Sequence, residues 1–273
     1  MQVPAYPILE VYMYSHHRDS IENTIRFFEK DPGVSALLLG GSIAHGFAAA
    51  ESDVDVMIII PDDLYAERLH DQQLTFFNRE LATYPDGYVD GKYLSLGFLK
   101  DIRDKGSEPA RYAFQNAQIL FSRIDNLPQT LKAITRYPVE QKADRIQRFY
   151  AQFEAWHWYT GEALRLKNTY LLDLSVSKFI LFGGRLLMAH NEQLYPYHKW
   201  FLRVLSELPD KPVGLLEQIE RVTTSPNPEA IELFYQTIRT FREWGTSSVA
   251  WPAQFMLDSE LNWLEGKTPV DDL

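Results

Sequence analysis

The sequence contains no cysteine, and this absence removes several kinds of chemistry at once. Without thiols the chain can form neither disulfides nor zinc–thiolate sites, and it has no cysteine nucleophile. Any catalytic metal ion must therefore be held by oxygen atoms or by imidazole nitrogens.

Long apolar runs are missing as well. The longest, such as residues 56–60 and 179–182, fall far short of the roughly 20 residues that span a bilayer. Residues 1–20 lack a basic segment followed by an uninterrupted apolar core, which is the pattern of a secretory signal. We therefore expect a cytoplasmic protein without a membrane segment.

Positive charge is scarce. The chain has 27 lysines and arginines against 37 aspartates and glutamates, a formal net charge of -10 and a pI near 5.2. This balance disfavours nucleic acid as a partner, because nucleic-acid binding normally needs a field of basic side chains. A cationic small molecule fits the charge better, although many proteins are acidic for solubility alone.

The first third of the chain alternates helix and strand patterns. Ser20 as an N-cap, followed by Ile21, Ile25 and Phe28, predicts a helix over residues 20–30. Strands are predicted over residues 34–39, 53–60, 88–96 and 118–121, with a helix over 63–83 and further helices opening at Ser42 and Glu108. These elements predict an α+β domain.

The second half of the chain carries helical spacing only. Its predicted helices cover residues 139–167, 170–190, 197–208, 212–222 and 228–244. The composition changes near Pro128 and Pro138, so we place the boundary between a first domain of residues 1–125 and a helical domain of residues 126–273. With 273 residues, of which 45% are hydrophobic, the chain is long enough for one large core or two smaller ones.

Two aspartates stand at the start of an apolar strand. Side chains at positions i and i+2 of a strand share a face, so Asp53 and Asp55 project side by side. Carboxylates this close repel one another, and a divalent cation such as magnesium or manganese relieves the repulsion. The apolar residues 56–60 would anchor the strand in the core and hold the two ligands rigidly.

A glycine pair and a serine precede these aspartates. Gly40 and Gly41 allow close backbone approach, and a following helix N-terminus offers free N–H groups to a phosphate, to which Ser42 can add a hydroxyl. Taken separately, the glycines also fit a tight turn, and the aspartates fit a solvated strand start. The combination indicates a site for a nucleoside triphosphate with magnesium.

Gly-Gly-Ser at 40–42, followed by Asp53-Val54-Asp55, resembles the signature of the DNA polymerase β-like nucleotidyltransferase superfamily. The similarity is to its small and antibiotic-modifying branch, which includes kanamycin and lincosamide nucleotidyltransferases. The resemblance implies a mixed β-sheet flanked by helices, two magnesium ions bound by Asp53 and Asp55, and triphosphate contacts from Gly41 and Ser42. We add Gly40 as a further nucleotide-binding candidate. Family members usually have an arginine where this chain has His45, which leaves His45 as either a structural residue or a weak phosphate contact.

The resemblance also calls for a third carboxylate on a neighbouring strand. We choose Asp90 as a metal ligand, a general base or both, over Asp86, whose Pro-Asp-Gly setting favours a turn. Lys92 on the same strand face either balances the local negative charge or binds phosphate, and the alternative is an edge-strand lysine. Arg111 either reaches the pocket or pairs on the surface, and we favour surface pairing. Ser52 would support the orientation of the aspartate that follows it.

The predicted helical domain supplies fewer candidates. Lys199 resembles a lysine that contacts nucleotide phosphate in some family members, and the alternative is a surface lysine. Trp156, His157 and Trp158 are most simply core or interface residues on one long helix. The pair at positions 16–17, two histidines, is too isolated to predict a metal site.

The predicted activity is transfer of a nucleoside monophosphate from a nucleoside triphosphate to a hydroxyl of a small-molecule acceptor, with release of pyrophosphate. We expect two Mg2+ ions as cofactors with the bound nucleotide, and Asp53, Asp55 and Asp90 as catalytic residues. Two alternatives stay open, which are a protein or RNA acceptor and a nucleotide-binding regulatory module without catalysis. We also allow for a homodimer.

Overall fold

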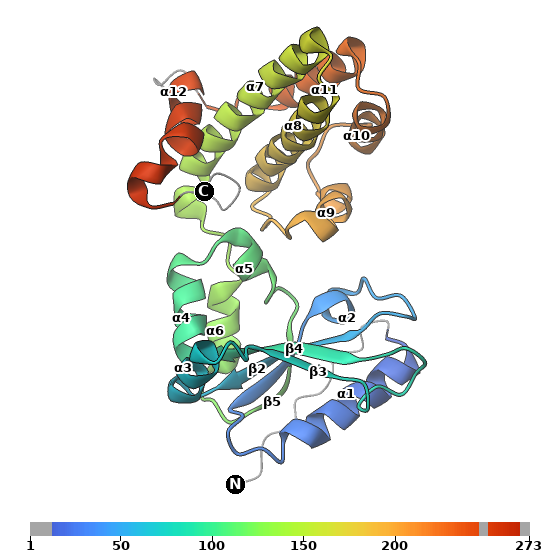
Figure 1. The fold of residues 1–273 in the computed structure, drawn as a ribbon, viewed down its shortest axis with the longest axis vertical. Coiled ribbons are helices and arrows are strands. Elements are labelled where there is room, and N and C mark those ends of the chain that lie inside the picture. The colour runs from blue at the N-terminus through green and yellow to red at the C-terminus, as the bar shows by residue number, and fades with distance from the viewer. Residues whose placement is uncertain (1–12, 246–250, 268–273) are drawn as a thin grey trace. The chain divides into compact units, whose positions relative to one another are not determined.

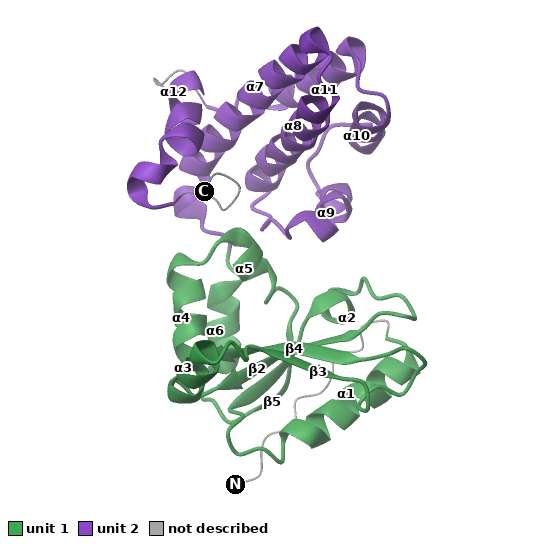
Figure 2. Ribbon diagram, in the orientation of Figure 1, with its two compact units in different colours: residues 1–136 green, residues 137–273 purple. Residues whose placement is uncertain are grey.

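The computed structural model of the protein describes residues 13–245 and 251–267. It divides into two compact units, Met1–Arg136 and Tyr137–Leu273 (Figure 2). This division comes later than the predicted boundary after residue 125, because helix α6 (Leu127–Ile134) packs its apolar side chains into the core of the first unit. None of the described helices is both long enough and apolar enough to cross a membrane.

A single mixed sheet forms the centre of the first unit (Figure 1). Within the described residues its strands are β1 (Ala36–Leu39), β2 (Val54–Ile60), β3 (Thr75–Asn78), β4 (Val89–Ser95) and β5 (Gln118–Ser122), in the order β3-β4-β2-β1-β5. Strands β2 and β4 pair in parallel, whereas the other neighbours pair antiparallel. The predicted α+β fold with a mixed sheet is confirmed.

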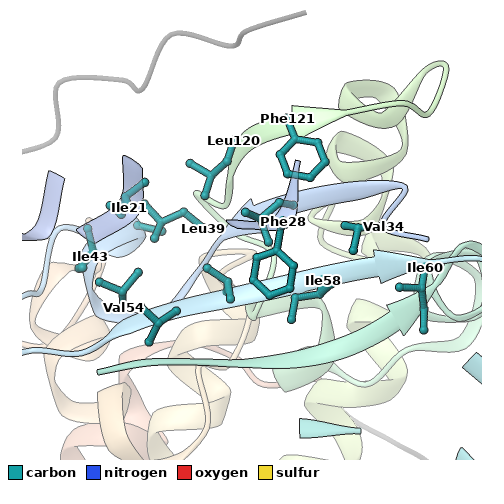
Figure 3. Close-up of a cluster of buried hydrophobic side chains, with 14 residues drawn as sticks. Ile21, Phe28, Val34, Leu39, Ile43, Val54, Ile58, Ile60, Leu120 and Phe121 are labelled. Atoms are coloured by element: carbon teal, nitrogen blue, oxygen red, sulfur yellow. The ribbon is translucent and has the colours of Figure 1, made fainter. Parts of the chain in front are cut away.

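Helices cover both faces of this sheet. They are α1 (Ser15–Phe28), α2 (Gly41–His45), α3 (Asp62–His70), α4 (Leu96–Lys105), α5 (Glu108–Tyr112) and α6. On one face Ile21 and Phe28 of α1 pack with Ile58 of β2 (Figure 3). On the other face Ile59 of β2 packs with Leu99 of α4 and with α6. Strand β2 is therefore buried on both sides, which explains its unbroken apolar run.

Two of the predicted elements were wrong in part. Helix α1 begins at Ser15, so Ser20 is not its N-cap, and the buried Ser20 hydroxyl instead donates a hydrogen bond to the carbonyl of His16 at 2.7 Å. The helix predicted over residues 63–83 ends at His70, and Thr75–Asn78 forms the edge strand β3. Phe76 packs against the core there while Phe77 is exposed, as period-two alternation requires.

The second unit is helical, as predicted. Its helices are α7 (Lys142–Leu166), α8 (Thr169–His190), α9 (Phe201–Glu207), α10 (Leu215–Thr224), α11 (Pro228–Phe241) and α12 (Trp251–Phe255), with short 3-10 or π turns at Val139–Gln141, His198–Trp200, Met256–Glu260 and Asn262–Glu265. The side chain of Asn168 caps α8 by accepting from the Leu171 N–H at 3.1 Å. Phe153, Phe179 and Phe234 meet in the core that joins α7, α8 and α11.

Two helix-interior glycines should respond in opposite ways to alanine. A β-carbon added at Gly161 of α7 meets no described atom within 4 Å, so Gly161→Ala should raise the free energy of unfolding by about 0.5–1 kcal/mol through helix propensity. A β-carbon added at Gly184 of α8 would overlap the ring of Phe201, so Gly184→Ala should lower it by about 1–3 kcal/mol. Urea unfolding of both variants measures the difference, and equal shifts would contradict the packing described here.

Candidate active site

Three aspartates converge where β2 and β4 begin. The parallel register pairs Asp55 of β2 with Asp90 of β4, and Asp53 lies two residues before Asp55. Each of the three offers a carboxylate oxygen, and these oxygen atoms all lie within 4.8 Å of one another. The side chains are partly exposed, so an ion from solvent can reach them. The structure thus brings together the three carboxylates that were predicted as metal ligands.

The backbone after β1 packs directly against Asp55. The Gly40 N–H donates to the Asp55 carbonyl at 2.9 Å, and α2 begins at the next residue. Gly41 has a φ of +59°, and a β-carbon there would overlap the Asp55 carboxylate. Both the left-handed backbone and the lack of space require glycine at position 41. At Gly40 a β-carbon would meet only the flexible end of Met57, at 3.1 Å.

Ser42 follows Gly41 in helix α2 and carries a hydroxyl group. Its side chain is only 6% exposed. Within the described residues its buried oxygen has no hydrogen-bond partner. Buried hydroxyl groups are normally paired, so this one is free to bind a ligand atom that enters beside Gly41.

The segment before Asp53 is held by helix α1 and by the loop before β4. The Ser52 carbonyl accepts from the Tyr84 hydroxyl at 2.5 Å and lies 2.9 Å from Nε2 of His17. A carbonyl can only accept, so Nε2 of His17 must carry the proton. Burial is the main cause that lowers the pKa of His17, and the ring therefore favours its neutral form. His16 adds a hydrogen bond to the Ala50 carbonyl at 2.8 Å.

Tyr88 contacts Asp53 itself. Its hydroxyl forms a hydrogen bond with the Asp53 side chain, and this bond is the main cause that raises the pKa of Tyr88. Burial, followed by the negative charge of Asp53, raises the pKa of Tyr84 as well. Both phenols thus stay protonated and able to donate at neutral pH.

The sequence alone did not identify Tyr84, Tyr88 or His17 as parts of the site. For Tyr88 a signal was present, because it lies two residues before Asp90 and so shares a strand face with it. For His17 no such signal was present, because its partner Ser52 lies 35 residues further along the chain.

His45 makes packing contacts. Its ring stacks on Tyr112 of α5, with centroids 4.7 Å apart and planes 16° from parallel, and on Phe47 at 5.6 Å. Burial lowers the pKa of His45, which favours the neutral imidazole. These contacts support the structural alternative for His45 over the phosphate contact.

Arg111 does not pair on the surface, and that prediction was wrong. Its side chain is 7% exposed, and the guanidinium donates to three backbone carbonyls, those of Arg103 at 2.7 Å, Gly106 at 3.0 Å and Ile134 at 3.1 Å. These bonds tie the end of α4 to the end of α6, because the five donors of a guanidinium can serve several carbonyls at once.

The two predicted lysine contacts stay predictions. Lys92 is exposed on β4, two residues beyond Asp90 and on the same face of the strand. Lys199 belongs to the second unit, where it is exposed and its Nζ lies 5.1 Å from the centroid of the Trp200 ring.

Arg111→Lys tests whether Arg111 stabilises the fold without taking part in metal binding. Lysine cannot reach three separated carbonyls, and buried carbonyls left without a donor should lower the free energy of unfolding by about 2–3 kcal/mol. Divalent-metal affinity of the folded protein should stay unchanged, because none of these three bonds involves an aspartate of the site. Chemical denaturation and metal titration calorimetry measure the two effects. A loss of metal affinity at full stability would contradict a structural role.

Gly41→Ala and Gly40→Ala form a matched pair for the site. At position 41 the new methyl group displaces the Asp55 carboxylate and the left-handed backbone is strained, so divalent-metal affinity should fall at least about tenfold. At position 40 the Met57 side chain can move aside, and affinity should stay close to that of the unchanged protein. Calorimetric titration with Mg2+ or Mn2+ compares the two, with thermal unfolding as the check on folding. Similar losses in both variants would overturn the specific role given to Gly41.

Residues 21–124 match the family model of the nucleotidyltransferase domain. A solved structure, that of a nucleotidyltransferase-like protein from Exiguobacterium sibiricum 255-15, is similar over 93% of this chain and 83% of that chain, with 11% identity and a TM-score of 0.47. No curated protein matches the chain. Residues 21–124 therefore form a nucleotidyltransferase domain, and this match supports nucleotidyl transfer as the activity of the domain.

Proposed function

We propose that the protein transfers a nucleoside monophosphate from a nucleoside triphosphate to a hydroxyl group of a small-molecule acceptor and releases pyrophosphate. The observation that carries this proposal is the convergence of Asp53, Asp55 and Asp90 within 4.8 Å, in a domain of the nucleotidyltransferase family. Three carboxylates this close are costly without a cation, and hard oxygen ligands suit magnesium.

The residues present fit a magnesium-bound triphosphate. Asp53, Asp55 and Asp90 would hold the ions, for which we propose two Mg2+. Bound at this place, such ions neutralise charge on the attacking and leaving oxygens of a phosphoryl transfer. The buried Ser42 hydroxyl, which lacks a partner within the described residues, and the backbone of Gly40 and Gly41 would contact the phosphates.

The reaction follows from these placements. The acceptor oxygen forms a bond to the α-phosphorus, and the bond from that phosphorus to the bridging oxygen of the β-phosphate breaks, so pyrophosphate leaves. Asp90 would take the proton of the acceptor hydroxyl as general base. Tyr88 would keep the Asp53 carboxylate oriented through its hydroxyl, and the bonds of His17 and Tyr84 to Ser52 would fix the backbone before it. Lys92 is proposed as a further phosphate contact.

The acceptor side is proposed for the second unit. The net charge of -10 favours a neutral or cationic small molecule over RNA, and Lys199 is proposed as a nucleotide contact from this unit. Hydroxyl-bearing antibiotics are one acceptor class to test, because of the resemblance to the antibiotic-modifying branch. A protein acceptor would be revealed by labelled macromolecules in a lysate that disappear with Asp53→Asn.

Asp90→Asn and Asp86→Asn test which of the two aspartates is the third carboxylate of the site. Asp86 is exposed with a φ of 58°, a conformation that asparagine accepts, so Asp86→Asn should keep nearly full activity. Asp90→Asn removes both a metal ligand and the general base, and the rate should fall by about 10²- to 10⁴-fold. The assay follows pyrophosphate release and transfer of label from nucleoside triphosphates, ATP first, with Mg2+ and a panel of aminoglycosides, lincosamides and other hydroxyl compounds.

The same assay separates the alternatives. Absence of pyrophosphate release with every acceptor would count heavily against the proposed transfer. Tight binding of magnesium and nucleotide without turnover, unchanged in Asp90→Asn, would favour a regulatory nucleotide-binding module instead.

A further inference from the structure

The second unit contains a pocket of its own. It has a volume of about 510 Å³ and lies between α7, α11 and the start of α12. Sites for small organic molecules usually have volumes of about 300–1,000 Å³. The pocket is therefore large enough for such a ligand.

Two tryptophans are among the residues that line the pocket. Trp158 of α7 lines the pocket although it is 54% exposed, and Trp251 of α12 lines it from another helix. An exposed indole is costly in water, and its face attracts organic cations as well as apolar groups. Trp158 was predicted as a core or interface residue, and an exposed fraction of 54% excludes the core role only.

Three of the other lining residues carry negative charge. Glu154, Glu162 and Glu232 line the pocket, and its described lining includes neither lysine nor arginine. Glu162 is neutralised by Arg165 at 2.6 Å, and Arg239 offsets part of the charge of Glu154. Glu232, by contrast, accepts from the neutral amide of Gln236 at 2.7 Å.

His157 does not supply the missing positive charge. Its Nε2 lies 3.5 Å from the Glu232 carboxylate, but burial outweighs that attraction and lowers the pKa of His157. The imidazole therefore favours its neutral form at neutral pH, and the charge of Glu232 is left for a ligand.

The wall between α7 and α11 is already ordered. The rings of His157 and Tyr235 stack at 3.8 Å with planes 4° apart, and the Tyr235 hydroxyl donates to both oxygens of Glu154 at 2.9 and 3.1 Å. A ligand that binds here would not have to order these side chains first, which reduces the entropic cost of binding.

A glycine keeps the pocket open. Gly161 lies inside the 25-residue helix α7 and lines the pocket, and a β-carbon there would meet no described atom within 4 Å. Neither close packing nor a left-handed backbone requires glycine at this position. Glycine weakens a helix interior, so its presence here is best explained by the space that a side chain would fill.

We propose that this pocket binds a small organic cation with an apolar body, such as an arylalkyl amine. The ammonium group is recognised by Glu232, and the apolar body lies against the faces of Trp158 and Trp251. None of the residues of this pocket is a proposed metal or phosphate ligand, so amine binding can be measured whether or not the protein transfers a nucleotide.

Binding to the whole protein tests the proposal without any assay of transfer. We would titrate 2-phenylethylamine, with 2-phenylethanol as its neutral counterpart and 3-phenylpropionate as an anion, by calorimetry and tryptophan fluorescence. The amine should bind at one saturable site, at least about tenfold more tightly than the alcohol, and the anion should not bind. Equal binding of all three compounds, or no saturable binding of the amine, would overturn the proposal.

Three variants locate the site. Glu232→Gln should weaken amine binding about fivefold, the size expected for one partly exposed ion pair. Gly161→Leu should weaken it at least about tenfold by filling the pocket, while thermal unfolding shows that the helix is intact. Glu220→Gln makes the same charge change at an exposed position of α10 outside the pocket lining and should leave binding unchanged. Equal effects of Glu232→Gln and Glu220→Gln, or full binding in Gly161→Leu, would contradict this location.

Discussion

The candidate site depends on one feature of the sheet, which is the parallel pairing of β2 with β4. This pairing places Asp55 directly beside Asp90, and a strand places Asp53 beside Asp55 on the same face. A register shift of one residue would turn Asp90 to the opposite face of the sheet and separate the three carboxylates. The chemistry of the domain therefore rests on a backbone register.

A comparison of carboxylate repulsion with the free energy of apolar burial shows why the fold tolerates three aspartates so close together. Two carboxylates about 4 Å apart repel by about 1 kcal/mol in water and by about 4 kcal/mol near a protein surface of lower dielectric. Val54, Val56, Ile58, Ile59 and Ile60 of the same strand are each at most 3% exposed. A fully buried aliphatic side chain contributes about 1.5–3 kcal/mol. The apolar half of β2 thus outweighs the repulsion at its first residues, and a bound cation turns that repulsion into attraction.

The sequence predicts those parts of the site whose residues lie close together along the chain, and it misses contacts between residues that are far apart in the sequence. Asp53, Asp55 and Gly41 follow from strand periodicity and from the short segment between two strands, and Asp90 follows from the family resemblance. Arg111 and the contact of His17 with Ser52 depend on tertiary packing, and neither leaves a pattern in neighbouring residues. Strand β3 was missed for a related reason, since it is a short edge strand whose pairing partner β4 comes later in the chain.

Acidic side chains are used differently in the two units. In the first unit aspartates are brought to one point with small backbone groups around them, which suits a compact, strongly hydrated metal ion. In the second unit Glu232, which accepts from a neutral amide, lines one pocket with two tryptophans, and this setting suits a larger cation with a weaker hydration shell. The net charge of -10 raises the local concentration of cations around both units without selecting among them. Selection has to come from the shape of each site, and for this reason Gly41 and Gly161 matter as much as the carboxylates beside them.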